Sequence, residues 1–187
     1  RCISAALMRL IDICANVYRR NLMLKPLGAI MELRTLVAQD IPSIWQINHE
    51  GLPGTGEVTE DEIAELMSIS EISLGIFEAD KLLGFVLCLL PKTTYGSLNY
   101  AWFNQNYTDF IYVDRVAVSP NQRNRNIGSQ LYQEVINYAQ RNNCPIAAEV
   151  SLNPPNPGSM RFHERHGFVE VGVLHHSSKS VTMMIRE

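Results

Sequence analysis

The residues between Val118 and Leu131 are the part of the chain whose types and spacing indicate chemistry most clearly. They read VSPNQRNRNIGSQL, so an apolar strand ends near Pro120 and a loop rich in Arg, Asn and Gly leads into a helix. Backbone N–H groups in such a loop and in the first helical turn have no intrahelical acceptor and lie at the positive end of the helix dipole. Arg123 and Arg125 add formal charge. The segment predicts a phosphate-binding turn; the alternative is an ordinary strand-to-helix connection with solvated arginines.

The segment from Asn156 to Phe168, NPGSMRFHERHGF, carries the second set of informative residues. Asn at an N-cap, Pro157 at the first helical position and Gly167 after the last turn predict a helix between them. His163 lies inside that helix. Because an imidazole titrates near neutrality, His163 could donate a proton as imidazolium; the alternative is a neutral histidine in the core or at the surface.

Other reaction classes lack the residues they need. His163 and His166 are three apart and His175 adjoins His176, but no Cys or carboxylate stands beside them at zinc-like spacing. We therefore expect no metal. The chain contains no G-x-S-x-G, which marks a hydrolase nucleophile, and no G-x-G-x-x-G, which marks a dinucleotide-binding turn.

A sheet and helices must position these residues, and the apolar pattern predicts both. The expected strands are Glu32–Leu36, two strands joined around Ala79–Lys81, Phe110–Val118, Ile146–Leu152, Phe168–Leu174 and Val181–Ile185. The expected helices start near Asp40, run from about residue 60 to 68, lead from the Arg-rich loop to Asn142 and Asn143, and follow Asn156.

Two local signals complete the order of elements. Thr59 followed by Glu62 is a capping box, which predicts a helix start at about residue 60. The polar and aromatic segment Tyr95–Thr108, with Gly96 and several Asn, is expected to be an exposed loop. The order is a strand, two helices, three strands, a helix, a strand, a helix and two strands, which indicates a mixed α/β sheet.

The length of 187 residues and the 46% apolar content favour a single domain with one sizeable core. Residues 31–187 are expected to form it, because Met31 begins a strand-like segment. Residues 1–30 hold five Arg and Lys against one Asp and predict an amphipathic helix, too short and too charged to span a bilayer. The alternatives for residues 1–30 are an upstream extension foreign to the domain and a helix that binds a membrane surface or a partner.

Charge and cysteine content bear on partners and compartment. Residues 31–187 hold eleven Lys and Arg and eighteen Asp and Glu, a net charge of about −7, which disfavours nucleic-acid binding. The four cysteines show no C-x-x-C pair and no spacing of a secreted disulfide framework. They predict reduced thiols in a cytoplasmic protein.

The element order and the two segments together resemble the GNAT superfamily of N-acetyltransferases over about residues 31–187. The family pattern Val-x-x-x-x-Arg-x-x-Gly-x-Gly/Ala is matched by Val118, Arg123 and Gly128, with Asn126 in place of the first Gly. Asn adopts a left-handed backbone more readily than other non-Gly residues, so the turn is expected to survive this change.

The second segment is similar to the family pattern Asn-x-x-Ala-x-x-x-Tyr-x-x-x-Gly-Phe, with His163 in place of Tyr. The resemblance implies an α/β fold with a central, mixed and mostly antiparallel sheet. Its fourth and fifth strands would splay apart to admit a cofactor, and helices would flank it.

The resemblance also implies acetyl-CoA as the acyl donor, with no metal, and a path for that donor. The backbone of the fourth strand would pair with the pantetheine amides, the turn would hold the diphosphate, and two residues of the second segment would line the arm. The residues so assigned are Val116, Ala117 and Val118 on the strand, Arg123, Asn124, Arg125, Asn126, Ile127, Gly128 and Ser129 in the turn, and Asn156 and Ser159 along the arm.

By the same resemblance the acceptor amine borders the fourth strand, where alternation places Tyr112, Asp114 and Val116 on one face. Asp114 is the first candidate to bind an ammonium group or take its proton; the alternative is a structural pair with a neighbouring Arg. Glu149 on the fifth strand is the second candidate for the base, with a structural role as its alternative. His163 is the candidate to protonate the leaving thiolate, although a coenzyme A thiolate can also leave unassisted.

These features predict an N-acetyltransferase that moves an acetyl group from acetyl-CoA to a small amine or an amino-acid-like acceptor by direct attack in a ternary complex. The alternatives are acetylation of protein N-termini or lysines, a GNAT-like module that senses acyl-CoA without turnover, and an interaction protein assembled through its N-terminal helix. A homodimer would be expected to pair through the C-terminal strands.

Overall fold

The structure is a computed structural model that describes residues 30–187. The amphipathic helix predicted over residues 1–30 lies outside the described residues, apart from Ile30. The strands are β1 (Met31–Thr35), β2 (Ile72–Glu78), β3 (Lys81–Leu89), β4 (Ile111–Val118), β5 (Ile146–Asn153), β6 (Val169–His175) and β7 (Ser180–Arg186). The helices are α2 (Ile41–Glu50), α3 (Glu60–Ile69), α4 (Leu98–Asn106), α5 (Ile127–Asn142) and α6 (Pro157–Arg165), with short 3-10 turns η1 (Ala38–Asp40) and η2 (Pro120–Gln122).

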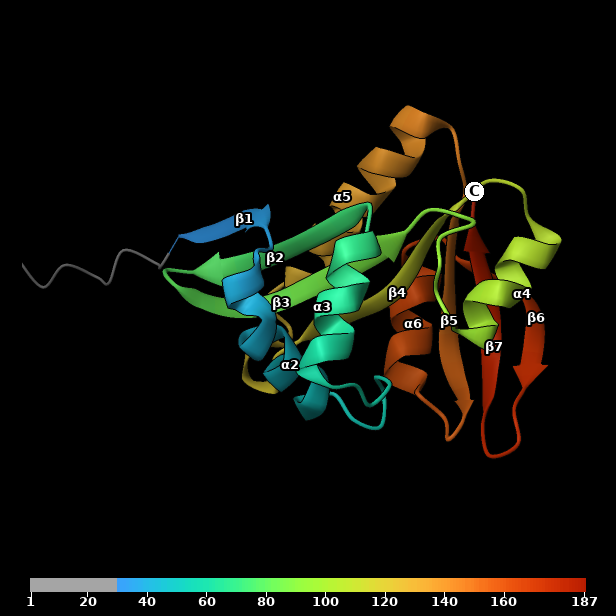
Figure 1. The fold of residues 1–187 in the computed structure, drawn as a ribbon, viewed down its shortest axis with the longest axis horizontal. Coiled ribbons are helices and arrows are strands. Elements are labelled where there is room, and N and C mark those ends of the chain that lie inside the picture. Colours follow the sequence, from blue (N-terminus) through green and yellow to red (C-terminus); the bar gives the residue numbers. More distant parts are fainter. Residues whose placement is uncertain (1–29) are drawn as a thin grey trace, which may run out of the picture. The chain divides into compact units, whose positions relative to one another are not determined.

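The seven strands form one sheet in the order β1-β2-β3-β4-β5-β7-β6 (Figure 1). Neighbouring strands are antiparallel, except that β4 and β5 are parallel. This arrangement confirms the predicted mixed, mostly antiparallel sheet. It also places β4 and β5, which precede the two motif-bearing segments, side by side in the middle of the sheet.

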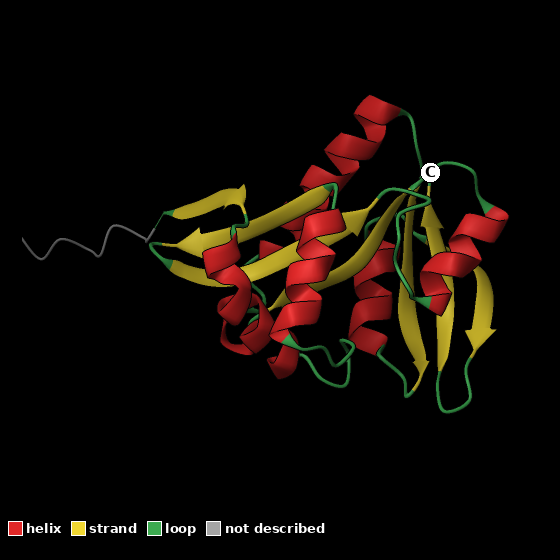
Figure 2. Cartoon of the chain, viewed as in Figure 1, coloured by secondary structure: helices red, strands yellow, loops and turns green. Residues whose placement is uncertain are grey.

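Helices cover both faces of this sheet (Figure 2). On one face, α2, α3 and α4 bury residues such as Ile44, Ile63 and Phe103 in one apolar cluster. On the other face, α5 and α6 contribute Leu131 and Phe162 to a second cluster. Burying a side chain of this size stabilises a fold by about 1.5–3 kcal/mol.

Several local sequence signals are confirmed. The Thr59 hydroxyl accepts a hydrogen bond from the Glu62 N–H, and the Glu62 carboxylate accepts one from the Thr59 N–H, which is a capping box. Asn156 caps α6 through its side chain, and Pro157 begins that helix. Gly167, which follows its C-terminus, has a φ of 83°.

The expectation of an exposed loop over Tyr95–Thr108 is wrong, because α4 occupies most of this segment. Tyr100 and Phe103, three residues apart, are buried against Tyr112 of β4 and Phe110, which directly precedes that strand. Asn99, Asn104 and Asn106, which flank these aromatics, obscure the helical pattern in the sequence. Tertiary packing of two rings, rather than intrinsic helix propensity, stabilises α4.

Within the described residues the two cysteines, Cys88 and Cys144, are free thiols, as predicted for them. None of the helices in residues 30–187 has the length and apolar character needed to cross a bilayer.

Candidate active site

The opening between β4 and β5 is the feature around which the site is built. Within the described chain these strands share only two residue pairs, which involve Ile111 and Tyr112 of β4, and beyond them they diverge (Figure 1). On its other edge β4 stays paired with β3 as far as Val118. The edge of residues 113–118 that faces β5 is thus open, which confirms the predicted splay.

The turn between β4 and α5 has the backbone expected of an anion-binding turn. Asn124 and Asn126 have φ values of 63° and 64°, and Asn126 is the N-cap of α5. The prediction that Asn126 adopts a left-handed conformation is confirmed. The first intrahelical hydrogen bond runs from the Gln130 N–H to the Asn126 carbonyl, at 3.0 Å. The N–H groups of residues 127–129 therefore have no helical acceptor and face outward at the positive end of α5.

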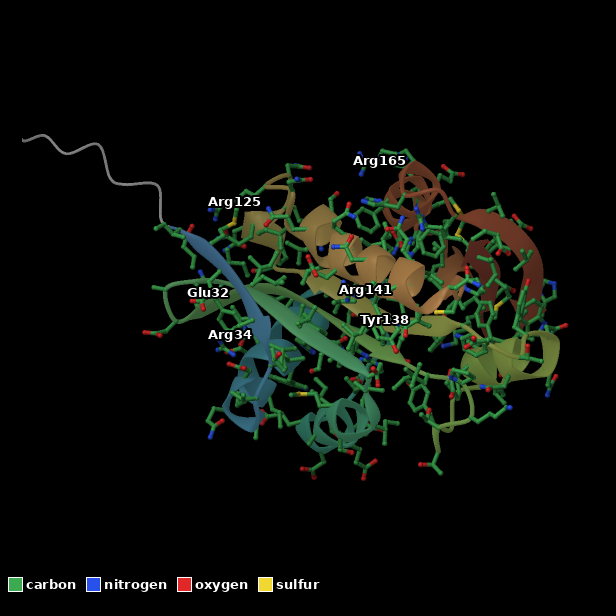
Figure 3. The ribbon with its side chains drawn as sticks, turned by 90° about the horizontal axis from the view of Figure 1, so that it is seen from above. Glu32, Arg34, Arg125, Tyr138, Arg141 and Arg165 are labelled. Carbon is green, nitrogen blue, oxygen red and sulfur yellow. The ribbon has the colours of Figure 1, made fainter. Side chains whose placement is uncertain are left out.

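The two arginines of the turn have different surroundings. Arg125 lies in the turn just before α5 (Figure 3), where its guanidinium contacts Gln122 and stands 2.6 Å from the Glu78 carboxylate. Arg123 instead lines a cavity of about 310 Å³. The positive charge of Arg125 is offset by its partner, so Arg123 is the arginine better placed to meet an anion in the opening.

This cavity lies where the open ends of β4 and β5 face each other, and the α2–α3 loop forms its third wall. Asn156 lines it, and its Oδ1 accepts a hydrogen bond from the Ser159 N–H at 3.1 Å. The Asn156 amide also lies against Gly54 of the α2–α3 loop, since a Cβ on Gly54 would be 2.9 Å from Asn156 Nδ2. Asn156 thus caps α6 and supports the loop across the cavity.

Close packing of α5 on α6 joins the two motif-bearing segments. A Cβ on Gly128 would lie 3.2 Å from the Phe162 ring, which explains the absence of a side chain at Gly128. Ser159 lies in the first turn of α6, with its hydroxyl 3.4 Å from His163 Nδ1. The turn between β4 and α5 and the α6 motif therefore belong to one packed unit.

The expectation that Tyr112, Asp114 and Val116 share one face is wrong. β3 residues 87 and 88 pair with Arg115 and Val113, so a β-bulge leaves Asp114 without a partner in β3. An extra residue reverses the alternation beyond it, and Tyr112 and Val116 accordingly pack on opposite faces of the sheet. Bulges of this kind often lie beside active sites and redirect side chains there.

Asp114 is paired with its neighbour. Arg115 Nε lies 2.7 Å from Asp114 Oδ2, and the Asp114 side chain is only 4% exposed. Arg115 also donates a hydrogen bond to Asn48 Oδ1 of α2, at 3.0 Å. This is the alternative considered for Asp114, a carboxylate engaged by a neighbouring arginine.

Glu149 lies on β5 just beyond the last β4–β5 pair, and its carboxylate accepts two hydrogen bonds. The Tyr112 hydroxyl donates to Oε2 at 2.8 Å, and the Asn99 amide donates to Oε1 at 2.9 Å. Burial and the charge of Asp114 raise the pKa of Glu149, whereas the two hydrogen bonds and the charge of Arg115 lower it. The net result is a pKa of about 7. A carboxylate with this pKa changes protonation state in the range where a general base operates.

His163 is a buried and neutral histidine. Its Nδ1 lies 2.9 Å from the Ser159 carbonyl, which can only accept, so Nδ1 carries the proton. Its Nε2 then accepts a hydrogen bond from the Tyr132 hydroxyl at 2.6 Å. Burial lowers the pKa of His163 to about 4. This arrangement matches the alternative of a core histidine and gives no support to an imidazolium acid at neutral pH.

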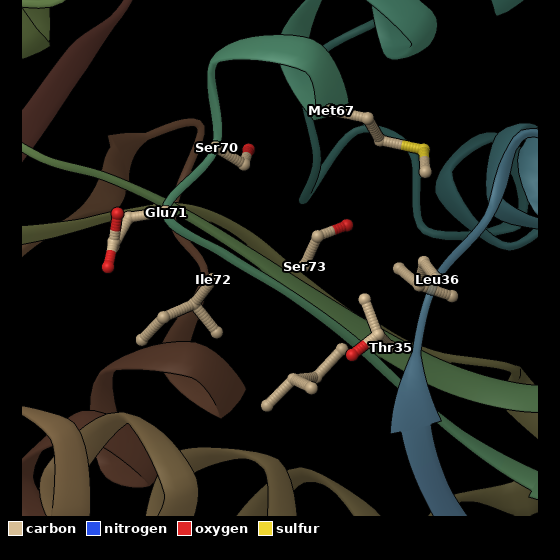
Figure 4. Close-up of a pocket in the computed structure, with 8 residues that line it drawn as sticks. Thr35, Leu36, Met67, Ser70, Glu71, Ile72 and Ser73 are labelled. Carbon is tan, nitrogen blue, oxygen red and sulfur yellow. The ribbon is translucent and has the colours of Figure 1, made fainter.

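A second cavity, of about 350 Å³, lies away from this site (Figure 4). It is bordered by the end of β1, the end of α3 and the start of β2. Ser73 Oγ is buried there without a hydrogen-bond partner among the described residues. None of the predicted site residues lines this cavity. Nor does any group of three or more His, Cys, Asp or Glu side chains in residues 30–187 form a potential metal site.

Sequence reasoning did not identify Asn99 and His176 as site residues. Asn99 lies in the unpredicted helix α4, and His176, in the β6–β7 turn, has its Nε2 2.8 Å from Asn99 Oδ1. The adjacent His175 and His176 were considered only as metal ligands. The contact joins residues 77 positions apart, so no local pattern could reveal it.

The comparisons with known proteins agree with this geometry. The model of a family described as "Acetyltransferase (GNAT) family" matches residues 41–168. No curated protein matches the chain. Similar solved structures include Ard1 from Thermoplasma volcanium, with 20% identity and a TM-score of 0.68 over 83% of this chain and 96% of that one.

Two other similar structures are described as an N-acetyltransferase and as a complex with a bisubstrate analogue. The ribosomal-protein-S18-alanine N-acetyltransferase from Escherichia coli has 14% identity and a TM-score of 0.65, over 84% of this chain and 93% of its own. Arabidopsis thaliana Naa50, in complex with the bisubstrate analogue CoA-Ac-MVNAL, has 16% identity and a TM-score of 0.63, over 84% of this chain and 98% of its own. At these identities the likeness concerns the fold.

Proposed function

The chain belongs to the GNAT acetyltransferase family, and on that premise we propose that it is an N-acetyltransferase in which Glu149 deprotonates a primary amine acceptor. The acyl donor of this family is acetyl-CoA. The observation that carries the proposal is the opening between β4 and β5, which has the left-handed turn before α5 at one end and the Glu149 carboxylate at the other.

The donor would bind along this opening. The free edge of Val116 to Val118 offers backbone groups to the pantetheine amides, and the N–H groups of residues 127–129 with Arg123 would hold the diphosphate. Asn156, which lines the cavity between them, would border the pantetheine arm. A groove of this kind orients the thioester carbonyl for attack.

The reaction proceeds by direct attack in a ternary complex. An acceptor ammonium first gives a proton to the Glu149 carboxylate, directly or through a water, and the neutral nitrogen then bonds to the thioester carbonyl carbon. The C–S bond breaks with its electron pair moving to sulfur, and the tetrahedral nitrogen loses its second proton to solvent. Nε2 of His163 accepts a hydrogen bond from the Tyr132 hydroxyl and carries no proton of its own. The thiolate therefore leaves without help from His163.

An acceptor panel tests this proposal. Acetyl-CoA is combined with polyamines, amino acids, aminated small molecules and short peptides, and free thiol release is followed together with the mass of the product. Peptides are included because two of the similar structures are described as a ribosomal-protein acetyltransferase and as a complex with a peptide-bearing analogue. A mass gain of one acetyl group on an amine is expected. Tight acetyl-CoA binding without thiol release from any acceptor would instead favour the acyl-CoA sensor.

Arg123→Ala is expected to weaken acetyl-CoA binding about tenfold, the loss typical of one charge-assisted phosphate contact. Arg125→Ala is the matched control, because its guanidinium is already paired with Glu78. We expect that variant to change the dissociation constant less than about threefold. Titration calorimetry with acetyl-CoA measures both, and equal effects of the two substitutions would contradict the assignment of Arg123.

Three wider expectations accompany this function. Residues 31–187 would act as the single catalytic domain, with residues 1–30 as an extension. A homodimer would pair through the C-terminal strands, where β6 forms the sheet edge and exposes Val169. The cytoplasmic localisation expected from reduced cysteines stays a prediction.

A further inference from the structure

The amide of Asn99 connects Glu149 to the β6–β7 turn. Its Nδ2 donates to Glu149 Oε1 at 2.9 Å, and its Oδ1 lies 2.8 Å from His176 Nε2. Asn99 is the second residue of α4, the helix inserted between β3 and β4. Three separate parts of the chain thus meet through one side-chain amide.

The chemistry of these groups fixes where the protons lie. An amide oxygen can only accept, so His176 Nε2 carries a hydrogen and donates it to Asn99. The amide nitrogen then points at Glu149, where it can only donate. If the amide were flipped, its oxygen would face Glu149 and its NH2 group would oppose the His176 N–H. The ionised Glu149 carboxylate can only accept and so sets this orientation, and the Nε2–H tautomer of His176 supports it; the flipped amide would require His176 to carry its hydrogen on Nδ1 instead.

We propose that Asn99 is a positioning residue for Glu149, and that His176 acts through it by holding the amide in the orientation that stabilises the carboxylate. This inference rests on the proposed role of Glu149 as the base. The Tyr112 hydroxyl occupies the second carboxylate oxygen from β4, so the two donors together fix the plane of the carboxylate. A base held in this way keeps its orientation toward the acceptor during proton transfer.

The charged and titratable groups around Glu149 give the direction of the effect. From β4, the charge of Asp114 raises its pKa, whereas Arg115 and the Tyr112 hydroxyl lower it. From α4, the Asn99 amide lowers it, and behind that amide lies His176 of the β6–β7 turn. Removing the amide takes away one stabilising donor, so the pKa of Glu149 rises further above its usual range.

Substitution at Asn99 leaves the anchors of α4 in place. The Tyr100 hydroxyl donates to the Leu90 carbonyl at 2.6 Å and accepts from the Thr93 N–H at 2.8 Å. Phe103 is fully buried, and Ser97 caps the helix through its side chain. The helix is therefore expected to fold without the Asn99 amide.

The test compares the wild-type protein with the variants Asn99→Ala, His176→Ala and His176→Gln, each made in the full chain. Asn106→Ala is the matched control, because Asn106 is on the same helix but is exposed, and its amide donates to the Trp102 carbonyl instead. The pKa of Glu149 is measured by carbon-13 NMR of glutamate-labelled protein, with Glu149→Gln for the assignment. The pH profile of kcat/KM is recorded with acetyl-CoA and the best acceptor of the panel.

With Asn99→Ala, the Glu149 titration and the ascending limb of kcat/KM should both move up by about 0.5 to 1 pH unit. A smaller shift in the same direction is expected for His176→Ala. In His176→Gln, whose amide can also donate, both values should return toward those of the wild type. Unchanged values for both Asn99→Ala and His176→Ala overturn the inference, and so does a shifted titration with an unshifted profile. Full activity in Glu149→Gln would instead refute the proposed base, which separates the two failures.

Discussion

Glu149→Gln is expected to lower kcat at pH 8 by about 100- to 1,000-fold, the loss typical when a general base is removed. Gln keeps the volume of the side chain and can still accept a hydrogen bond from the Tyr112 hydroxyl. The dissociation constant of acetyl-CoA should therefore change less than about twofold. An assay of free thiol release measures kcat, and titration calorimetry measures the dissociation constant of acetyl-CoA. A loss in acetyl-CoA binding equal to the loss in kcat would show that Glu149 holds the site together rather than taking a proton.

The pH dependence of the wild-type enzyme provides an independent check. A base acts when ionised, and the pKa of Glu149 is raised to about 7, so kcat/KM should increase with pH through that value. Asp114→Asn serves as the comparison, because the Asp114 charge is one cause of the raised pKa. Its ascending limb should move to lower pH, with a smaller loss of kcat at pH 8 than in Glu149→Gln. The opposite ranking would make Asp114 the base.

The second large effect concerns stability at acid pH and involves His163. Burial lowers its pKa to about 4 in the folded protein, whereas an unfolded histidine titrates near 6.5. Between pH 6.5 and 4, His163 is therefore protonated in the unfolded chain but stays neutral in the folded protein. The stabilising contribution of neutral His163 is complete above pH 6.5 and is lost progressively as the pH falls toward 4, by roughly 3 kcal/mol.

Urea unfolding of wild type and His163→Gln between pH 4 and 7.5 measures this contribution. Glu149 has a raised pKa and acts in the opposite sense over the same range, so the difference between the two proteins is the informative quantity. That difference should shrink by roughly 3 kcal/mol from pH 7 to pH 4, because Gln does not titrate. A constant difference would mean that His163 has the same pKa, near 6.5, in the folded and the unfolded protein, and would restore it as a candidate acid.

The sequence predicted the sheet, the turn and most helices because their signals are local. Asn126 in a left-handed N-cap and Asn156 with Pro157 at the start of α6 follow from residue types at fixed offsets. Helix α4 did not follow, because its buried stripe consists of Tyr100 and Phe103 alone and depends on rings from β4 and its approach.

The arrangement of side chains around Glu149 was less accessible to sequence reasoning. One extra residue at Asp114 reverses every later side chain of β4, and nothing in the strand's composition marks the bulge. The environment of Glu149 could not be predicted, because its donors, Tyr112 and Asn99, are 37 and 50 residues away in the chain. Its environment is a product of topology rather than of any motif.

The short contact between β4 and β5 also has a mechanical meaning. Within residues 30–187, two adjoining residue pairs join a four-stranded and a three-stranded half of the sheet. A thioester arm seated in the gap would bridge those halves from edge to edge. If the proposed function holds, acetyl-CoA therefore links the two halves of the sheet while it is bound, as well as reacting. This link is lost when coenzyme A leaves and forms again when the next acetyl-CoA binds.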